Sequence, residues 1–146
     1  MSLNKNLTLE IIEKHLDKRW NWTHLTSTKF ITVEFIDKYS YKNWDWYKLS
    51  RESWQKKYKN IKFTIEFIDK YSDKCWNWDD LTRHPVMTFE FIDKHPNKGW
   101  NWTYLSNHPK CTIEVIKHMP KEYRLFANLL SHTNILQIRQ EFPNFY

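Results

Sequence analysis

Glycine is almost absent from this chain, because Gly99 is the single glycine among 146 residues. Tight turns between β-strands depend on glycine, so its scarcity argues against an all-β fold and excludes a glycine-rich phosphate-binding loop. Only five prolines are present, and no stretch has the composition of a flexible linker. The length suits one ordinary domain. These absences together predict an all-α fold in a single domain, 1–146.

Long apolar runs and paired cysteines are missing as well. No stretch approaches the roughly 20 apolar residues that a membrane span requires, and the first ten residues contain no apolar run of signal-peptide length. Cys75 and Cys111 have no CxxC partner, which argues against a disulfide framework and favours a reducing compartment. We therefore expect an intracellular protein that is neither secreted nor bound to a membrane.

Tryptophan, in contrast, is abundant and regularly spaced. Eight of the nine tryptophans form four pairs with one residue between the partners: Trp20 and Trp22, Trp44 and Trp46, Trp76 and Trp78, and Trp100 and Trp102. The first members lie 24, 32 and 24 residues apart, so one interval holds eight extra residues. Such a period predicts a solenoid of stacked repeats, and we assign these eight tryptophans to its structural core.

Threonine and glutamate extend the repeat count to five. Residues at the same position of successive repeats form what we call a column. One column holds Thr8, Thr32, Thr64, Thr88 and Thr112, and a second, two residues later, holds Glu10, Glu34, Glu66, Glu90 and Glu114. Threonine caps helix N-termini and glutamate is favourable near them, so each pair predicts the start of a first helix of about nine residues.

A second helix is predicted in each repeat by an N-capping column of Asn21, Asp45, Asn77 and Asn101. It is about one and a half turns long and ends near Thr26, Ser50, Thr82 and Ser106. Helices this short are marginal alone, so stacking must stabilise them. We predict a short solenoid of about five two-helix repeats with a C-terminal capping helix: 8–31, 32–63 with the eight-residue insertion, 64–87, 88–111, 112–135 and a cap at 136–146.

The fourth repeat shows the motif most completely. It reads Thr88-Phe89-Glu90-Phe91-Ile92, Pro96, Lys98, Trp100-Asn101-Trp102, Leu105-Ser106 and His108-Pro109. This pattern resembles the short tryptophan-rich helical repeats encoded by giant nucleocytoplasmic DNA viruses, over Thr8 to about Leu129. The resemblance implies a viral origin and a place in the host cytoplasm, the host nucleus or the virion. It brings no catalytic residue, cofactor or ligand with it.

Two lysine columns are the first candidates for a functional surface. One holds Lys14, Lys38, Lys70 and Lys94, and the other holds Lys18, Lys42, Lys74 and Lys98. In stacked repeats they would form a cationic stripe that could follow a phosphate backbone or an acidic partner. The alternative is a solvated exterior in which acidic residues neutralise the first column, since each of its lysines directly follows Glu13, Asp37, Asp69 or Asp93.

The insertion in the second repeat is the preferred candidate for a binding site. Residues 51–62 contribute +4 of the formal net charge of +6, through Arg51, Lys56, Lys57, Lys59 and Lys62 against Glu52. Trp54 and Tyr58 lie four residues apart, as on one helix face, and such mixtures of basic and aromatic groups occur on nucleic-acid surfaces. The alternative is an elongated second helix whose aromatic side chains pack inward.

Metal and catalytic motifs are not apparent. His84, His108 and His132 are 24 residues apart, which in a solenoid separates them too far to share a zinc ion, so we interpret them as linker residues. No HExxH or GxSxG motif is present. We expect no catalytic residue, cofactor, metal or small-molecule substrate. The leading hypothesis is a non-enzymatic scaffold for a protein partner or a second copy. The alternative is a basic DNA- or RNA-binding protein that contacts phosphates without sequence specificity.

Overall fold

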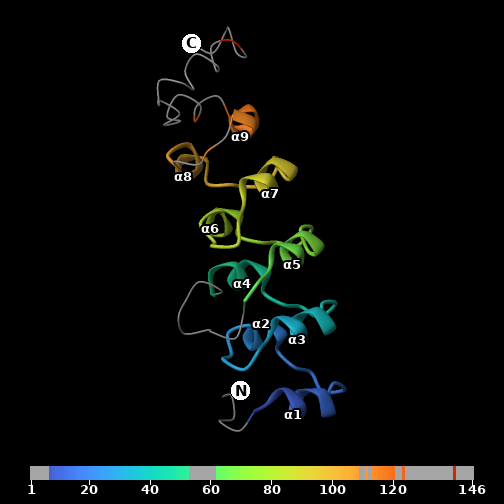
Figure 1. Cartoon of the computed structure of the whole chain (residues 1–146). Coiled ribbons are helices and arrows are strands. Elements are labelled where there is room, and N and C mark those ends of the chain that lie inside the picture. Colours follow the sequence, from blue (N-terminus) through green and yellow to red (C-terminus); the bar gives the residue numbers. More distant parts are fainter. Residues whose placement is uncertain are drawn as a thin grey trace. The chain divides into compact units, whose positions relative to one another are not determined.

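The computed structural model is helical. It contains nine short helices, α1 to α9, and no strand among the residues that it describes, so the predicted all-α fold class is confirmed (Figure 1). The chain divides into two compact units, Met1–Asn77 (unit 1) and Trp78–Tyr146 (unit 2). The boundary falls between the two tryptophans of the third repeat. The described residues are 7–52, 62–108, 111, 113–120, 123 and 140.

The first helix of each repeat begins where the threonine column predicts. The hydroxyls of Thr8, Thr32, Thr64 and Thr88 accept hydrogen bonds from the backbone N–H three residues later, which confirms these N-caps; Thr112 lies outside the described residues. The helices in unit 1 are α1 (Leu9–Lys14), α3 (Val33–Lys38) and α5 (Ile65–Lys70), and those in unit 2 are α7 (Phe89–Lys94) and α9 (Ile113–His118).

These first helices have six residues each, so the predicted length of about nine is wrong. The residue after each lysine leaves the helical conformation, as Tyr39 does with φ −116° and ψ 35°. Its carbonyl oxygen accepts a hydrogen bond from the indole N–H of the first tryptophan of the pair, for example from Trp44 at 2.9 Å. The same bond, at 2.7 to 2.8 Å, recurs at Trp20, Trp76 and Trp100. The carbonyl at the helix end thus accepts from the indole in addition to a backbone N–H, as Tyr39 does from Lys42 at 3.0 Å.

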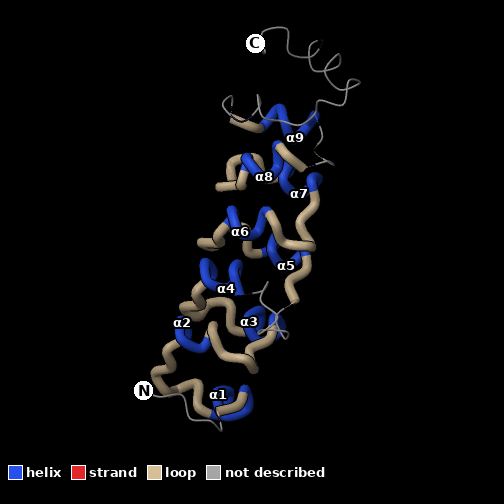
Figure 2. Tube along the Cα trace, turned by 90° about the vertical axis from the view of Figure 1, so that its left-hand side faces the viewer, coloured by secondary structure: helices blue, strands red, loops and turns tan. Residues whose placement is uncertain are grey.

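The second helices are α2 (Trp22–Leu25) and α4 (Trp46–Glu52) in unit 1, and α6 (Trp78–Thr82) and α8 (Trp102–Ser106) in unit 2. Asn21, Asp45 and Asn101 accept from the backbone N–H three residues later, as predicted for N-caps. Within unit 1, Figures 1 and 2 show α1, α3 and α5 following one another on one side, with α2 and α4 on the other. Unit 2 repeats this arrangement with α7 and α9 opposite α6 and α8.

Tryptophan rings close the junctions between successive repeats. The second tryptophan of one repeat meets the first tryptophan of the next edge to face, with ring centroids 5.0 to 5.2 Å apart: Trp22 with Trp44, Trp46 with Trp76, and Trp78 with Trp100. Beside them, Ile12, Ile36, Leu49 and Ile68 are completely buried. Of the eight paired tryptophans, five are buried (Trp22, Trp44, Trp46, Trp76 and Trp100) and three are half-buried (Trp20, Trp78 and Trp102).

A buried hydroxyl column adds a polar link across each of these junctions. Ser50 donates to the carbonyl of Trp46 at 2.9 Å and accepts from the backbone N–H of Asn77 in the next repeat at 2.8 Å. Thr26 and Thr82 make the equivalent pairs of bonds, to Asp45 and Asn101 respectively. A hydroxyl suits this position because it can donate and accept at once.

Over the described part of the chain, no helix has the length and apolarity needed to cross a membrane.

Candidate functional site

Two members of the first lysine column, Lys38 and Lys70, form ion pairs with carboxylates of the preceding repeat. The Nζ atom of Lys38 lies 2.7 Å from the carboxylate of Glu13, and that of Lys70 lies 2.7 Å from the carboxylate of Asp37. The hydroxyl of the tyrosine that follows each lysine donates to the same carboxylate. These hydrogen bonds, first from the lysine and then from the tyrosine, hold the pKa of Glu13 and of Asp37 below the usual values. Lys38 and Lys70 therefore follow the salt-bridged alternative.

Two members of the second lysine column lie on tryptophan rings, and the other two lie near aspartates. The Nζ of Lys42 is 5.3 Å from the centre of the Trp22 ring in the preceding repeat, and the Nζ of Lys98 is 5.2 Å from the Trp78 ring. Cation–π contacts of this kind attach the lysine to the neighbouring repeat. The two other members lie within 3.5 Å of the preceding aspartate: Lys18 with Asp17, and Lys74 with Asp73. All four lysines of this column therefore have contacts within the chain.

Most of the insertion lies outside the described residues, namely Trp54, Lys56, Lys57, Tyr58 and Lys59. Arg51 and Lys62, at its two ends, are described and exposed. The interpretation of this segment as a binding site therefore stays a prediction.

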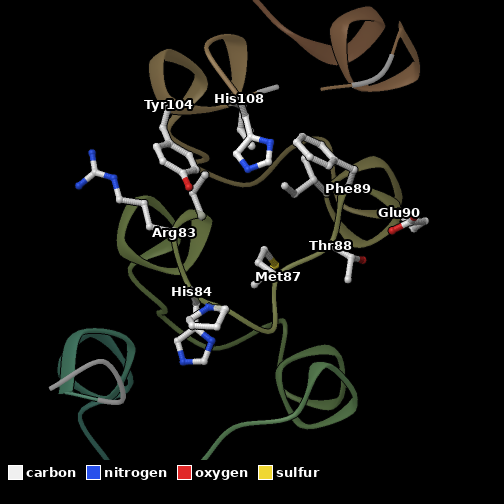
Figure 3. A pocket seen from close by; sticks show the side chains of 12 residues that line it. Arg83, His84, Met87, Thr88, Phe89, Glu90, Tyr104 and His108 are labelled. Carbon is white, nitrogen blue, oxygen red and sulfur yellow. The ribbon is translucent and has the colours of Figure 1, made fainter. Parts of the chain in front are cut away.

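A cleft of about 420 Å³ lies in unit 2, between the turn that follows α6 and the helix α8 (Figure 3). Its lining includes the apolar side chain of Met87 and the buried side chains of Ile92 and Leu105. The rings of Tyr104, His108 and Phe89 stand along one side. This volume falls within the range of about 300 to 1,000 Å³ typical of ligand sites.

Aromatic and cationic groups follow one another along that side without interruption. The rings of Phe89 and His108 are 5.1 Å apart, those of His108 and Tyr104 are 5.8 Å apart, and the guanidinium carbon of Arg83 lies 5.7 Å from the centre of the Tyr104 ring. We call these four residues the ring wall. A flat group laid along the ring wall meets π faces first and a permanent positive charge at its end.

His84 lies at the base of the cleft and is 8% exposed. Burial lowers the pKa of its imidazole, which favours the neutral form at pH 7. Its Nδ1 accepts from the backbone N–H of Val86 at 3.3 Å, so the proton of the neutral ring is on Nε2. The described part of the chain contains no group of three or more His, Cys, Asp and Glu side chains placed to hold a metal ion. His84 and His108 nevertheless line the same cleft, which the interpretation as linker residues did not anticipate; His132 lies outside the described residues.

Part of the cleft lining is not imposed by the repeat. Where unit 2 has His84, Phe89 and Tyr104, the preceding repeats have other residue types in the same columns: Thr28 for His84, Val33 and Ile65 for Phe89, and Lys48 and Asp80 for Tyr104. Arg83, in contrast, has the same residue type as Arg51 in its column. The columns that build the stack keep their chemistry, whereas those of His84, Phe89 and Tyr104 do not. This departure from the columns is the sequence signal that could have located the cleft.

The two cysteines lie in different surroundings. Burial raises the pKa of the Cys111 thiol to about 11, which keeps it protonated at neutral pH. Cys75 is an exposed free thiol in the other unit.

No family model, no curated protein and no solved structure matches this chain. The arrangement of its own residues therefore carries the functional argument.

Proposed function

We propose that this chain is a non-enzymatic helical-repeat scaffold that binds a protein partner, and that the cleft of unit 2 is its contact site. The observation that carries the proposal is the ring wall, in which Phe89, His108, Tyr104 and Arg83 follow one another along a cleft that Met87 also lines. Aromatic residues and arginine are the types most enriched in the energetically dominant parts of protein interfaces.

The charge pattern of the described residues also favours a protein partner. A protein that tracks a phosphate backbone needs several free cations along one path. Lys38 and Lys70 are paired with carboxylates of the preceding repeat, and Lys42 and Lys98 lie on tryptophan rings. The observation that supports a nucleic-acid partner instead is the excess charge of residues 51–62, whose ends Arg51 and Lys62 are exposed.

Selection from a random 12-residue peptide library displayed on phage, with the full chain immobilised, tests the proposal. We expect an enriched consensus whose synthetic version binds the chain in solution. In parallel, fluorescence anisotropy measures binding to a labelled random DNA duplex and a single strand at about 50 and 200 mM salt. The absence of a peptide consensus would overturn the scaffold, and affinity for DNA that falls steeply between these two salt concentrations would then favour phosphate binding.

A further inference from the structure

We propose that the cleft of unit 2 binds an extended peptide segment in which an acidic side chain lies next to an aromatic one. The acidic group contacts Arg83, and the aromatic ring lies on the ring wall beside Phe89 and His108. This inference rests on the proposed scaffold function, because it names the chemistry of the partner at the same site.

The charges around the cleft select an acidic group. Arg83 is exposed and is the only lysine or arginine among the described residues that line the cleft. Glu90 also belongs to the lining. Hydrogen bonds from its own backbone N–H and then from Thr88 hold its carboxylate and lower its pKa. Figure 3 shows its carboxylate turned away from the ring wall. An incoming carboxylate therefore meets a guanidinium, which can accept it in a bidentate pair.

The exposed rings of the ring wall favour an aromatic group in the bound segment. Tyr104 is 38% exposed, and Phe89 and His108 are half-buried, so their rings present surface to the cleft. A peptide ring placed against them makes the stacked or edge-to-face contacts that aromatic pairs prefer. Beneath it, Met87 offers a flexible thioether that adapts to the shape of a bound ring.

The site is long enough for neighbouring side chains of one segment. Arg83, Tyr104 and His108 also line a second, more open hollow of about 730 Å³, which continues over α8 to Asn101 and Asn107. The three shared residues stand between the two hollows. A segment that crosses them can therefore place one side chain in the cleft and its backbone over α8.

A nucleic acid fits this site less well than a peptide. Arg83, the one lysine or arginine in the described lining, could neutralise one phosphate, while Asp79 and Asp80 stand in the first turn of α6, the helix that Arg83 follows. Non-specific binding to nucleic acid needs several such contacts. Arg83 beside the rings of the ring wall instead suits a peptide with one acidic side chain next to one aromatic side chain.

The test uses the full chain labelled with ¹⁵N and three capped peptides of equal length. Their central sequences are Ser-Glu-Phe-Ser, Ser-Gln-Phe-Ser and Ser-Glu-Ala-Ser. Chemical-shift titration of backbone amides and of the Arg83 Nε–H gives the Kd of each. We expect the Glu-Phe peptide to shift resonances of Arg83, Phe89, Tyr104 and His108, and to bind about tenfold more tightly than the two others, the factor that about 1.4 kcal/mol of binding free energy produces.

The chain supplies its own matched variants. Arg83→Gln should remove the preference for the Glu-Phe over the Gln-Phe peptide while leaving the Gln-Phe affinity unchanged. Arg51→Gln, in the same column of the second repeat, should leave the preference intact. Phe89→Val introduces the residue that the second repeat has at Val33, so the stack should tolerate it, and binding of both phenylalanine peptides should weaken.

Equal binding of the Glu-Phe and Gln-Phe peptides to the wild-type chain overturns the inference. It is equally overturned by a preference that survives Arg83→Gln, by shifts confined to residues outside the cleft, or by no binding at millimolar peptide. If phage selection yields a consensus of another composition, the scaffold function stands and the acidic–aromatic chemistry does not. If selection yields no consensus, the scaffold function itself fails.

Discussion

Taken residue by residue, the two tryptophans of a pair stabilise the repeat in different ways. The first uses its indole N–H to satisfy a carbonyl at the end of the preceding helix, as Trp76 does with Tyr71 at 2.7 Å. The second places its ring against the first tryptophan of the next repeat, as Trp46 does with Trp76 at 5.1 Å. A phenylalanine could supply a ring but no donor. The pair is therefore a requirement of hydrogen bonding as well as of packing.

Trp76→Ala should destabilise the chain strongly, because Trp76 is 4% exposed and contacts the rings of Trp46 and Phe63. Loss of a buried aromatic side chain costs about 3 to 5 kcal/mol, a large share of a typical stability of about 5 to 15 kcal/mol. Urea unfolding followed by circular dichroism measures the change. Trp20→Ala is the control, since Trp20 makes the same hydrogen bond but is half-buried. An unfolding free energy that is unchanged in Trp76→Ala contradicts the structural role.

Within the helices and the turns between them, the sequence predicted helix starts better than helix ends. A start is marked by local capping, as at Thr32, whose hydroxyl accepts from a backbone N–H three residues away. At an end, the carbonyl accepts from an indole five residues further on, as Tyr39 does from Trp44, and no local propensity encodes that bond. The pairing of Lys70 with Asp37 was less visible still, because the partners lie 33 residues apart.

The candidate site was only partly predictable, for a related reason. Repetition identifies residues that build the stack, so it directed attention to the lysine columns and the tryptophan pairs. The cleft is lined in part by residues that depart from the columns, such as Phe89 and Tyr104, and its shape depends on how a turn lies against α8. The histidines His84 and His108 were noticed for their spacing alone, which does not show that they line one cavity.

Ser50→Ala should cost about 1 to 3 kcal/mol, because it leaves the backbone N–H of Asn77 without its hydroxyl acceptor at a buried junction. Ser50→Thr is the matched control, since Thr26 and Thr82 fill the same column and make the same bonds. Thermal unfolding of the two variants measures the difference. If the alanine and threonine variants melt together, the hydroxyl contributes nothing to the link between repeats.

The carboxylates that join the first helices should make stability depend on acidity. The pKa of Asp37 is lowered in the folded chain by hydrogen bonds from Lys70 and Tyr71. A carboxyl whose pKa falls on folding stabilises the folded state above its unfolded pKa of about 3.9, and this contribution disappears as the pH falls through the lower, folded pKa. We therefore expect the Tm to fall on acidification below about pH 5.

Asp37→Asn identifies the contribution of this one carboxyl. The variant should melt below the wild type at pH 7, and the difference should shrink as the pH falls, because acid removes the same charge from the wild type. Asp17→Asn is the control, since the recorded contact of Asp17 is with the adjacent Lys18. A difference in Tm between Asp37→Asn and wild type that stays constant from pH 7 to acid contradicts the assignment.

For the molecule as a whole, stability should be a sum of local contributions. Within unit 1, successive repeats interact through a recurring set of contacts: a tryptophan pair, a hydroxyl link and an ion pair, as at Trp46, Ser50 and Lys70. In unit 2, the tryptophan contact and the hydroxyl link recur at Trp78 and Thr82. Arrays of this kind lose structure near the site of damage before they unfold globally. Because the chain divides into two compact units, we expect damage in one unit to affect that unit most.

Trp100→Ala tests this locality by native-state hydrogen exchange. Trp100 is buried in unit 2 against Trp78 and Phe91, and its indole N–H bonds to the carbonyl of His95. Its loss should accelerate amide exchange in α7 and α8 by roughly a hundredfold or more, as about 3 kcal/mol or more of lost local stability implies, and should affect α1 and α3 much less. Trp44→Ala, in unit 1, should give the reverse pattern. Equal acceleration in all helices of both variants would mean that the described repeats unfold as one cooperative block.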